Sequence, residues 1–244
     1  MEVSRYPRTP HLEGSGLESP GGERVPFSEL RGLRLVVEEK LDDSHLALSF
    51  EQGRLRLHHR SSPVGREPEF APVKAWASGI LPELAQALGE RYVLHGGSLY
   101  AKHTVFYDAL PAWFVEYDVF DREQGEWLST ERRRQLLAAL PVHSAPVLHE
   151  GQLDSLAELV ALVGPSRYKS PGWRRALAEA AQGSAAAIAE TDQSDSGEGL
   201  YVKVEEGGRV SARYKWVRRG FLEALEGSGS HWRSRPLLAN RLAS

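Results

Sequence analysis

The segment 28–60 alternates between apolar and polar positions. The stretch "LRLVVEEK" at 33–40 begins with mostly apolar residues, and "LALSFEQGRLRLHHR" at 46–60 alternates with a period of two. Such alternation is typical of half-buried strands, and Gly53 is a residue type that favours a turn. We therefore predict a strand hairpin or meander, in which Lys40 ends one strand just before a tight turn and a second strand.

Further strand and helix patterns follow along the chain. Aromatic and β-branched residues, which favour strands, are concentrated at 92–107 and 112–121. The segment 199–219 predicts a hairpin around a Glu-Gly-Gly turn. Apolar residues recur at helical spacing in four segments, at 79–91, 129–140, 151–164 and 170–183. Strand-rich ends around a helical middle predict an α+β domain.

Local signals refine the last helix and the loop that follows it. Ser170 is placed as the N-cap of that helix, with Pro171 at its first helical position. The acidic and polar stretch "AETDQSDSGEG" at 189–199 predicts a mobile loop. Glycine, proline, serine and charge dominate 1–27 and predict an irregular arm. The expected organisation is this arm, a domain over 28–219 and a short C-terminal tail over 220–244.

Composition narrows the classes of function. The 244 residues are 41% hydrophobic, enough for one large globular domain, and include no cysteine, which excludes disulfides and cysteine nucleophiles. No apolar run is long enough to span a membrane, and "MEVSRYPRTP" is no signal peptide, so we expect a cytoplasmic protein. The net charge of −3 excludes a wholly basic nucleic-acid-binding protein. The stretch "RVSARYKWVRR" at 209–219 nevertheless holds five cations and no acid.

Lys40 is the first candidate for chemistry. It is one of only six lysines in an arginine-rich chain, and acids surround it at Glu38, Glu39, Asp42 and Asp43. A lysine can lose its proton and attack, whereas an arginine stays charged. The charge group is either a solvated cluster or a lysine nucleophile with carboxylates that position a metal ion.

Four further features follow Lys40 in order. Arg60 ends the next predicted strand, and in "WFVEYDVFD" Tyr117 shares one strand face with Trp113, Val115 and Val119. The two remaining features are pairs of charged residues near the end of the domain: Glu198 with Lys203 in "EGLYVK", and Arg213 with Lys215 in "RYK".

Taken together, "EKLDD", "HHR", "VEYDVFD", "EGLYVK" and "RYK" resemble the motifs of the ATP-dependent RNA ligases, within the covalent lysyl-AMP nucleotidyltransferase superfamily. The resemblance covers 33–219 and is closest to small bacterial members without an OB domain. It implies a nucleotidyltransferase (ATP-grasp-like) domain of antiparallel sheets flanked by helices.

The resemblance also implies a role for each motif residue. Lys40 would attack the α-phosphorus of ATP and form lysyl-AMP, with Lys203 and Lys215 as further catalytic residues. Asp42 and Glu198 would hold Mg²⁺ or Mn²⁺, largely through its waters. The nucleotide would be bound by residues from every motif, with Tyr117, or else Phe114, stacked on adenine: Glu39, Lys40, Arg60, Tyr117, Lys203, Arg213 and Lys215. A divalent cation with Lys203 or Lys215 would lower the pKa of Lys40.

Three positions depart from the family pattern. Asp43 stands where the first motif has glycine, and Arg213 stands where the last motif has its first lysine. Gly97 stands where RNA ligases have a glutamate that binds the ribose or a metal-bound water. This chain therefore lacks one carboxylate, and Asp43 and Glu116 are the candidates to supply it.

The leading hypothesis is an ATP-dependent RNA ligase that seals 5′-phosphate and 3′-hydroxyl RNA ends in RNA repair. Its expected partners are RNA ends and an end-processing repair protein, with no membrane. Two alternatives stay open at this point. One is a nucleotidyltransferase that adenylylates another acceptor, and the other is a nucleotide- or RNA-binding module that has lost its chemistry.

Overall fold

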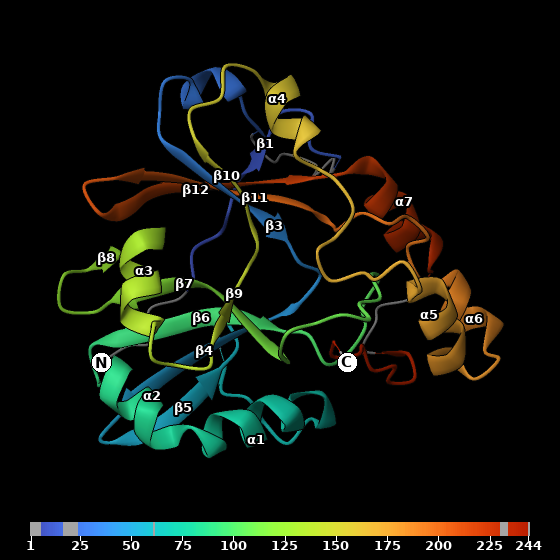
Figure 1. Cartoon of the computed structure of the whole chain (residues 1–244), viewed down its shortest axis with the longest axis horizontal. Helices are drawn as coiled ribbons and strands as arrows, with labels where there is room; N and C mark the ends of the chain where they lie inside the picture. The colour runs from blue at the N-terminus through green and yellow to red at the C-terminus, as the bar shows by residue number, and fades with distance from the viewer. Residues whose placement is uncertain (1–5, 17–23, 61, 230–233, 244) are drawn as a thin grey trace.

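The computed structural model describes residues 6–16, 24–60, 62–229 and 234–243, so parts of the expected arm and tail lie outside the described residues. Within them, two six-stranded sheets are stacked one above the other, with helices on their outer faces and at one end (Figure 1). None of the helices in these ranges is long and apolar enough to cross a membrane. The expected α+β fold of antiparallel sheets flanked by helices is confirmed.

The first sheet carries the strand that ends at Lys40. Its order is β10-β3-β11-β12-β1-β2, with β3 paired antiparallel to both β10 and β11. Its strands are β1 (His11–Leu12), β2 (Arg24–Val25), β3 (Leu35–Lys40), β10 (Val147–Gly151), β11 (Gly199–Glu206) and β12 (Arg209–Val217). The turn between β11 and β12 is Gly207–Gly208, with φ values of 57° and 78° that favour glycine. This is the hairpin turn that the sequence predicts.

The second sheet has the order β5-β4-β6-β7-β8, and β9 pairs with β7. Its strands are β4 (Ser44–Glu51), β5 (Arg54–His58), β6 (Tyr92–Ser98), β7 (Phe114–Asp121), β8 (Glu126–Trp127) and β9 (His143–Ser144). The predicted hairpin around Gly53 joins β4 to β5. However, β3 and β4 lie in different sheets, so the short turn 41–43 after Lys40 crosses from one sheet to the other.

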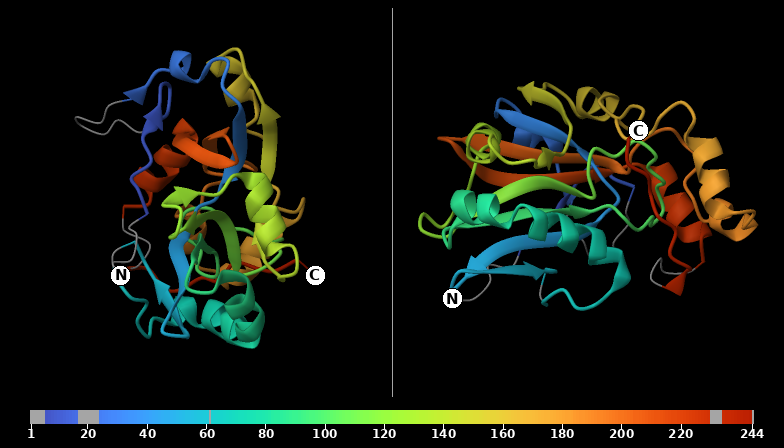
Figure 2. Two further views of the ribbon diagram at one scale, coloured as in Figure 1. Left: turned by 90° about the vertical axis from the view of Figure 1, so that its left-hand side faces the viewer. Right: turned by 60° about the horizontal axis from the view of Figure 1, so that its bottom comes forward.

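Helices cover the outer faces of both sheets. Leu84 and Leu88 of α2, with Val73 of α1, pack on the second sheet, and Leu159 of α4 packs on the first. The helices α5 to α7 gather at one end of the molecule (Figures 1 and 2). The α-helices are α1 (Ala71–Gly79), α2 (Leu81–Leu88), α3 (Thr130–Leu137), α4 (Leu156–Ala161), α5 (Trp173–Ala181), α6 (Ala185–Ala189) and α7 (Arg219–Gly227), and short 3-10 helices span Phe27–Leu30 and Pro68–Phe70.

Two expectations about helices were wrong. The helix α1 was not predicted, and the helix expected at 170–183 begins at Trp173 with Gly172 as its N-cap. Ser170 does not cap it, because the Ser170 hydroxyl and amide both donate to Asp108, the amide at 2.7 Å. The tertiary contact with Asp108 therefore replaces the capping role that the local sequence pattern predicts for Ser170.

Two segments expected to be irregular or mobile are held by hydrogen bonds. In the loop 190–198, the carboxylate of Asp195 accepts from Trp173 Nε1 at 2.7 Å, and Asp192 accepts from Arg218. In the arm, β1 pairs with β12, with His11 opposite Lys215. These partners lie far away in the sequence, so composition alone does not reveal them.

The described part of the tail packs on the loop 99–110 that follows β6. The side-chain Nδ2 of Asn240 donates to the carbonyl of Leu99 at 2.7 Å, and its Oδ1 accepts from the Tyr107 N–H at 2.9 Å. Asn240 is 3% exposed, so these bonds are shielded from water. The tail thus fixes the shape of this loop.

An arginine from α3 joins the two sheets through buried ion pairs. Arg133 is bound to Glu38 of β3 at 2.6 Å and to Glu116 of β7 at 2.7 Å, and all three side chains are at most 1% exposed. Burial lowers the pKa of Arg133, but the two carboxylates outweigh it and raise the pKa above its ordinary value. Arg133 is therefore charged and fully committed to this contact.

Further buried ion pairs link acids of β3 and β7 to two more strands of the first sheet. Lys203 of β11 lies 2.8 Å from Glu38 and 3.4 Å from Asp118 of β7, and Arg213 of β12 lies 3.5 Å from Asp118. We call Arg133, Lys203, Arg213, Glu38, Glu116 and Asp118 the buried charge network. Its three cations balance its three carboxylates, so the network as a whole carries no net charge.

Replacing Arg133 with methionine should lower the free energy of unfolding by about 3–5 kcal/mol, because it leaves the buried Glu116 without a cation and Glu38 with Lys203 alone. Arg134→Met is the matched control. Arg134 pairs with Glu150 at the surface, where it is 52% exposed, so its loss should change stability by about 0–1 kcal/mol. Urea unfolding of both variants tests this, and equal losses would contradict the role of the network.

Candidate active site

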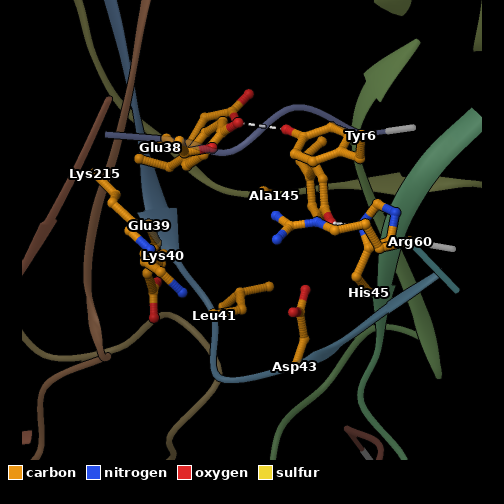
Figure 3. A pocket seen from close by; sticks show the side chains of 13 residues that line it. Tyr6, Glu38, Glu39, Lys40, Leu41, Asp43, His45, Arg60, Ala145 and Lys215 are labelled. Carbon is orange, nitrogen blue, oxygen red and sulfur yellow. Dashed lines mark hydrogen bonds between the residues drawn. The ribbon is translucent and has the colours of Figure 1, made fainter. Parts of the chain in front are cut away.

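A cavity of about 170 Å³ lies between the two sheets. Its walls come from both sheets, with Lys40 from β3 and Lys215 from β12 on one side and His45 from β4 and Arg60 across from them (Figure 3). The turn 41–43 forms its floor and carries Asp43 into it. With Tyr117 and Tyr201, which also line it, the cavity brings residues of all five sequence motifs into one site.

Lys40 is the last residue of β3 and lies opposite Gly199 of β11. Its Nζ donates to Glu198 Oε2 at 2.7 Å, and its side chain is 22% exposed. Burial lowers the pKa of Lys40, but Glu198, Asp43 and Asp42 outweigh it and the net pKa is raised. Without a ligand the side chain is therefore an ammonium, and it becomes a nucleophile only when these negative charges are offset.

Two acids beside Lys40, Glu198 and Asp43, have raised pKa values. Burial raises the pKa of Glu198 to about 7, with Lys40 acting against it and Asp42 adding to it. Burial also raises the pKa of Asp43 to about 6, against the opposing effect of Lys40. Both shifts mean that the cost of burying these carboxylates outweighs the stabilising charge of Lys40.

The carboxylate of Asp42 is held by hydrogen bonds from the loop 99–110. Its Oδ2 accepts from the N–H groups of Thr104 at 2.7 Å and Val105 at 2.8 Å, and its Oδ1 lies 3.6 Å from His103. Burial raises the pKa of Asp42, but these contacts outweigh it and the net pKa is lowered. Its carboxylate therefore holds the loop 99–110, and a metal-binding role for it stays a prediction.

The residues present fit a metal ion that keeps its waters. Across the described ranges, no three acids, histidines or cysteines are grouped to ligate an ion directly. Mg²⁺ usually needs only one or two carboxylates because it retains several waters. Glu198, whose carboxylate lies beside Lys40, matches that requirement.

Two cations complete the polar side of the cavity. Burial lowers the pKa of Lys215, and the nearby charge of Lys40 lowers it further. Arg60 follows β5 and is exposed at the cavity wall. With Lys40 they place three positive groups around one space, which suits a polyphosphate.

Aromatic rings form another wall. The Tyr117 hydroxyl is hydrogen-bonded to His45 Nδ1 at 2.5 Å, and the ring of Tyr6 meets Tyr117 edge-on with centroids 5.8 Å apart. Phe114, the other residue considered for stacking on adenine, is 1% exposed and stacked against Trp76 at 5.3 Å. Its ring is part of the core, so only Tyr117 remains available.

Two expected site residues are turned away from the cavity, and a third borders it with its carboxylate bound elsewhere. Lys203 and Arg213 lie beneath it in the buried charge network, and the Lys203 side chain is 0% exposed. The carboxylate of Glu39 accepts from Ser166 and from the Arg167 N–H, although the residue also borders the cavity. Lys203 is not among the main causes of the pKa shift of Lys40, and its ammonium is paired with Glu38 and Asp118.

Several residues that line the cavity were not assigned a role from sequence, among them Glu38, Tyr6 and His45. Glu38 had a usable signal, because it shares strand parity with Lys40. Tyr6 and His45 had none, since their positions depend on contacts such as that between Tyr6 and Asp118, 112 residues apart.

Three solved structures with the same fold are RNA ligases of Naegleria gruberi. An RNA ligase of Naegleria gruberi with AMP and Mn has a TM-score of 0.63 and 17% identity over 92% of this chain and 59% of that one. A variant with ATP and Mn has a TM-score of 0.62 and 17% identity over 91% and 58%. The same enzyme with PPi has a TM-score of 0.61 and 18% identity over 90% and 57%. This chain therefore spans less than two thirds of these neighbours.

Sequence comparison gives a second, independent result. Comparison with curated proteins found no match. The family model described as RNA ligase, however, matches residues 33–217, which include Lys40, Glu198 and Lys215. That match takes in most of the chain, and we conclude that the chain belongs to the RNA ligase family.

Proposed function

We propose that this chain is an ATP-dependent RNA ligase that forms lysyl-AMP on Lys40 and seals 5′-phosphate to 3′-hydroxyl RNA ends in RNA repair. The observation that carries the proposal is Lys40 at a strand end, bound to Glu198 and inside a cavity that also holds Lys215, Arg60 and Asp43. The Naegleria ligase structures contain ATP, AMP or PPi, which are the substrate and products of such a step.

In the first step, the neutral amine of Lys40 attacks the α-phosphorus of ATP. A P–N bond forms, the bond to the β-phosphate oxygen breaks and pyrophosphate leaves. Lys215 and Arg60 offset the charge that develops on the phosphates. AMP then passes to an RNA 5′-phosphate, and attack by a 3′-hydroxyl releases it.

Glu198, together with the predicted ligand Asp42, would hold a divalent cation, Mg²⁺ or Mn²⁺, through its waters. When bound, this cation supplies positive charge that offsets the carboxylates and the triphosphate. The carboxylates would then no longer raise the pKa of Lys40, and its proton would be lost more easily. RNA ends are the substrate in this proposal, an end-processing protein is the further partner, and the cytoplasm is the site of action.

Lys40→Ala should abolish covalent labelling by ATP that carries its label on the α-phosphate, because no other amine is placed at the strand end. The matched control is Lys74→Ala on α1, whose ammonium contacts the carbonyl of Gly65 away from the cavity. It should label normally. Mass spectrometry of the labelled protein should place AMP on Lys40, and label elsewhere would refute the assignment.

Adding 5′-phosphorylated RNA to the labelled protein separates the activities. Transfer of AMP to the RNA, followed by sealing, supports a ligase. Label that forms but never moves to RNA would point instead to another acceptor. No label at all would mean that the chain binds nucleotide or RNA without chemistry.

Lys215→Ala should slow labelling by about 100-fold, the typical effect of removing one group that stabilises transition-state charge. Arg219→Ala is the control, because Arg219 begins α7 and pairs at the surface with Glu223 at 3.0 Å. It should label at the rate of the unchanged protein. Comparable losses in the two variants would indicate a general charge effect.

Asp42 and Glu198 should differ in what their removal changes. Asp42→Ala leaves the N–H groups of Thr104 and Val105 without their acceptor and should lower the free energy of unfolding by about 1–3 kcal/mol for each unpaired group. Glu198→Gln should leave stability nearly unchanged but slow labelling and raise the Mn²⁺ concentration that it needs. Thermal unfolding and metal titrations distinguish the two, and identical behaviour would contradict the division.

A further inference from the structure

Gly97 of β6 and Asp43 occupy one space. A Cβ placed on Gly97 would lie 1.9 Å from Asp43 Oδ2 and 2.5 Å from its Cγ, far inside van der Waals contact. Gly97 pairs with His45 at the start of β4, so the turn 41–43 folds directly over it. The carboxylate of Asp43 therefore stands where a side chain at position 97 would begin.

The other acids near the cavity are engaged by the protein. Glu198 accepts from Lys40, Asp42 accepts from two backbone N–H groups, and Glu38 is bound by Arg133 and Lys203. Glu116, the second candidate to replace the expected carboxylate at position 97, is 1% exposed and accepts from Arg133 and Ser144. Glu116 is therefore not available to a ligand.

Asp43 differs from all of these. Among the described residues its carboxylate has no hydrogen bond and no ion pair within 4.0 Å, although the charges of Lys40 and His103 act on it at longer range. It lines the cavity and points into it, between Lys40 on one side and Arg60 and His45 on the other (Figure 3). Its acceptor capacity is thus directed at whatever the cavity binds.

The order of groups in a nucleotide indicates which group Asp43 meets. In the proposed function, Lys40 contacts the α-phosphate and Tyr117 contacts the base. The charge of Asp43 affects the pKa values of both residues. The sugar joins the α-phosphate to the base, so a group between Lys40 and Tyr117 faces the sugar. A carboxylate repels phosphate but accepts hydrogen bonds from hydroxyls.

We propose that Asp43 is a nucleotide-binding residue that accepts hydrogen bonds from the ribose hydroxyls, in place of a carboxylate on β6. The proposal rests on the proposed function, because it takes the nucleotide from there. Asp43 and Gly97 then depend on each other. The turn after Lys40 supplies the carboxylate, and β6 has glycine at position 97 because a side chain there would collide with it.

Calorimetry with AMP, 2′-deoxy-AMP and 3′-deoxy-AMP tests the contact without any chemistry. Asp43→Ala should weaken AMP binding by about tenfold or more, as loss of a hydrogen bond to a charged group does. It should weaken at least one deoxy nucleotide far less, so that the preference for ribose disappears. Asp154→Asn, an exposed acid far from the cavity, is the control and should keep that preference.

An exchange of the two positions tests the shared space. Asp43→Gly and Gly97→Glu should each reduce AMP binding and ATP labelling, the first by losing the carboxylate and the second by collision with Asp43. The double variant should recover part of both losses. Recovery cannot come from general damage, whereas losses that simply add would overturn the exchange.

The outcomes separate this inference from the proposed function. If the unchanged protein takes no label from ATP, the ligase proposal fails, and AMP binding still decides the role of Asp43. If labelling proceeds but Asp43→Ala keeps the ribose preference, the role of Asp43 is refuted and the ligase proposal stands. A change confined to Mn²⁺ affinity would also refute the ribose contact.

Discussion

The buried charge network is the constraint on which the site depends. Arg133 and Lys203 bind acids from both sheets, so the relative position of the sheets is fixed where the cavity lies between them. Each member would destabilise the fold if it were buried alone, and the balance of charge makes the arrangement tolerable. The distance between Lys40 on one sheet and Tyr117 on the other is therefore a property of this network.

The end of β3 divides structural and chemical roles between neighbouring residues. Strand alternation sends Glu38 and Lys40 to the face that looks at the second sheet and Glu39 to the other face. All three residues border the cavity, but Glu38 is bound in the network and Glu39 to the loop at 166–167, so Lys40 is the one of the three that presents its charge to a ligand. One short run of charge thus serves three different parts of the structure.

Local pattern was sufficient for part of this picture. It placed Lys40 at a strand end, Lys215 on the strand that lines the cavity and the turn at Gly207–Gly208, because strand period and turn chemistry act over a few residues. It did not reveal that Lys203 is buried on Glu38 and Asp118, or that Tyr6 enters the site. Those facts depend on pairings between distant segments, which neither periodicity nor composition encodes.

The pairing of β3 with β11 has a consequence for folding. It sets Lys40 against Glu198, 158 residues later in the chain, and contacts of such separation form slowly because long loops must close first. Neither sheet alone contains the complete cavity. The reactive lysine therefore acquires its surroundings only when the whole domain has assembled, and an incompletely folded chain presents an ordinary, fully protonated surface lysine that has no nucleotide to attack.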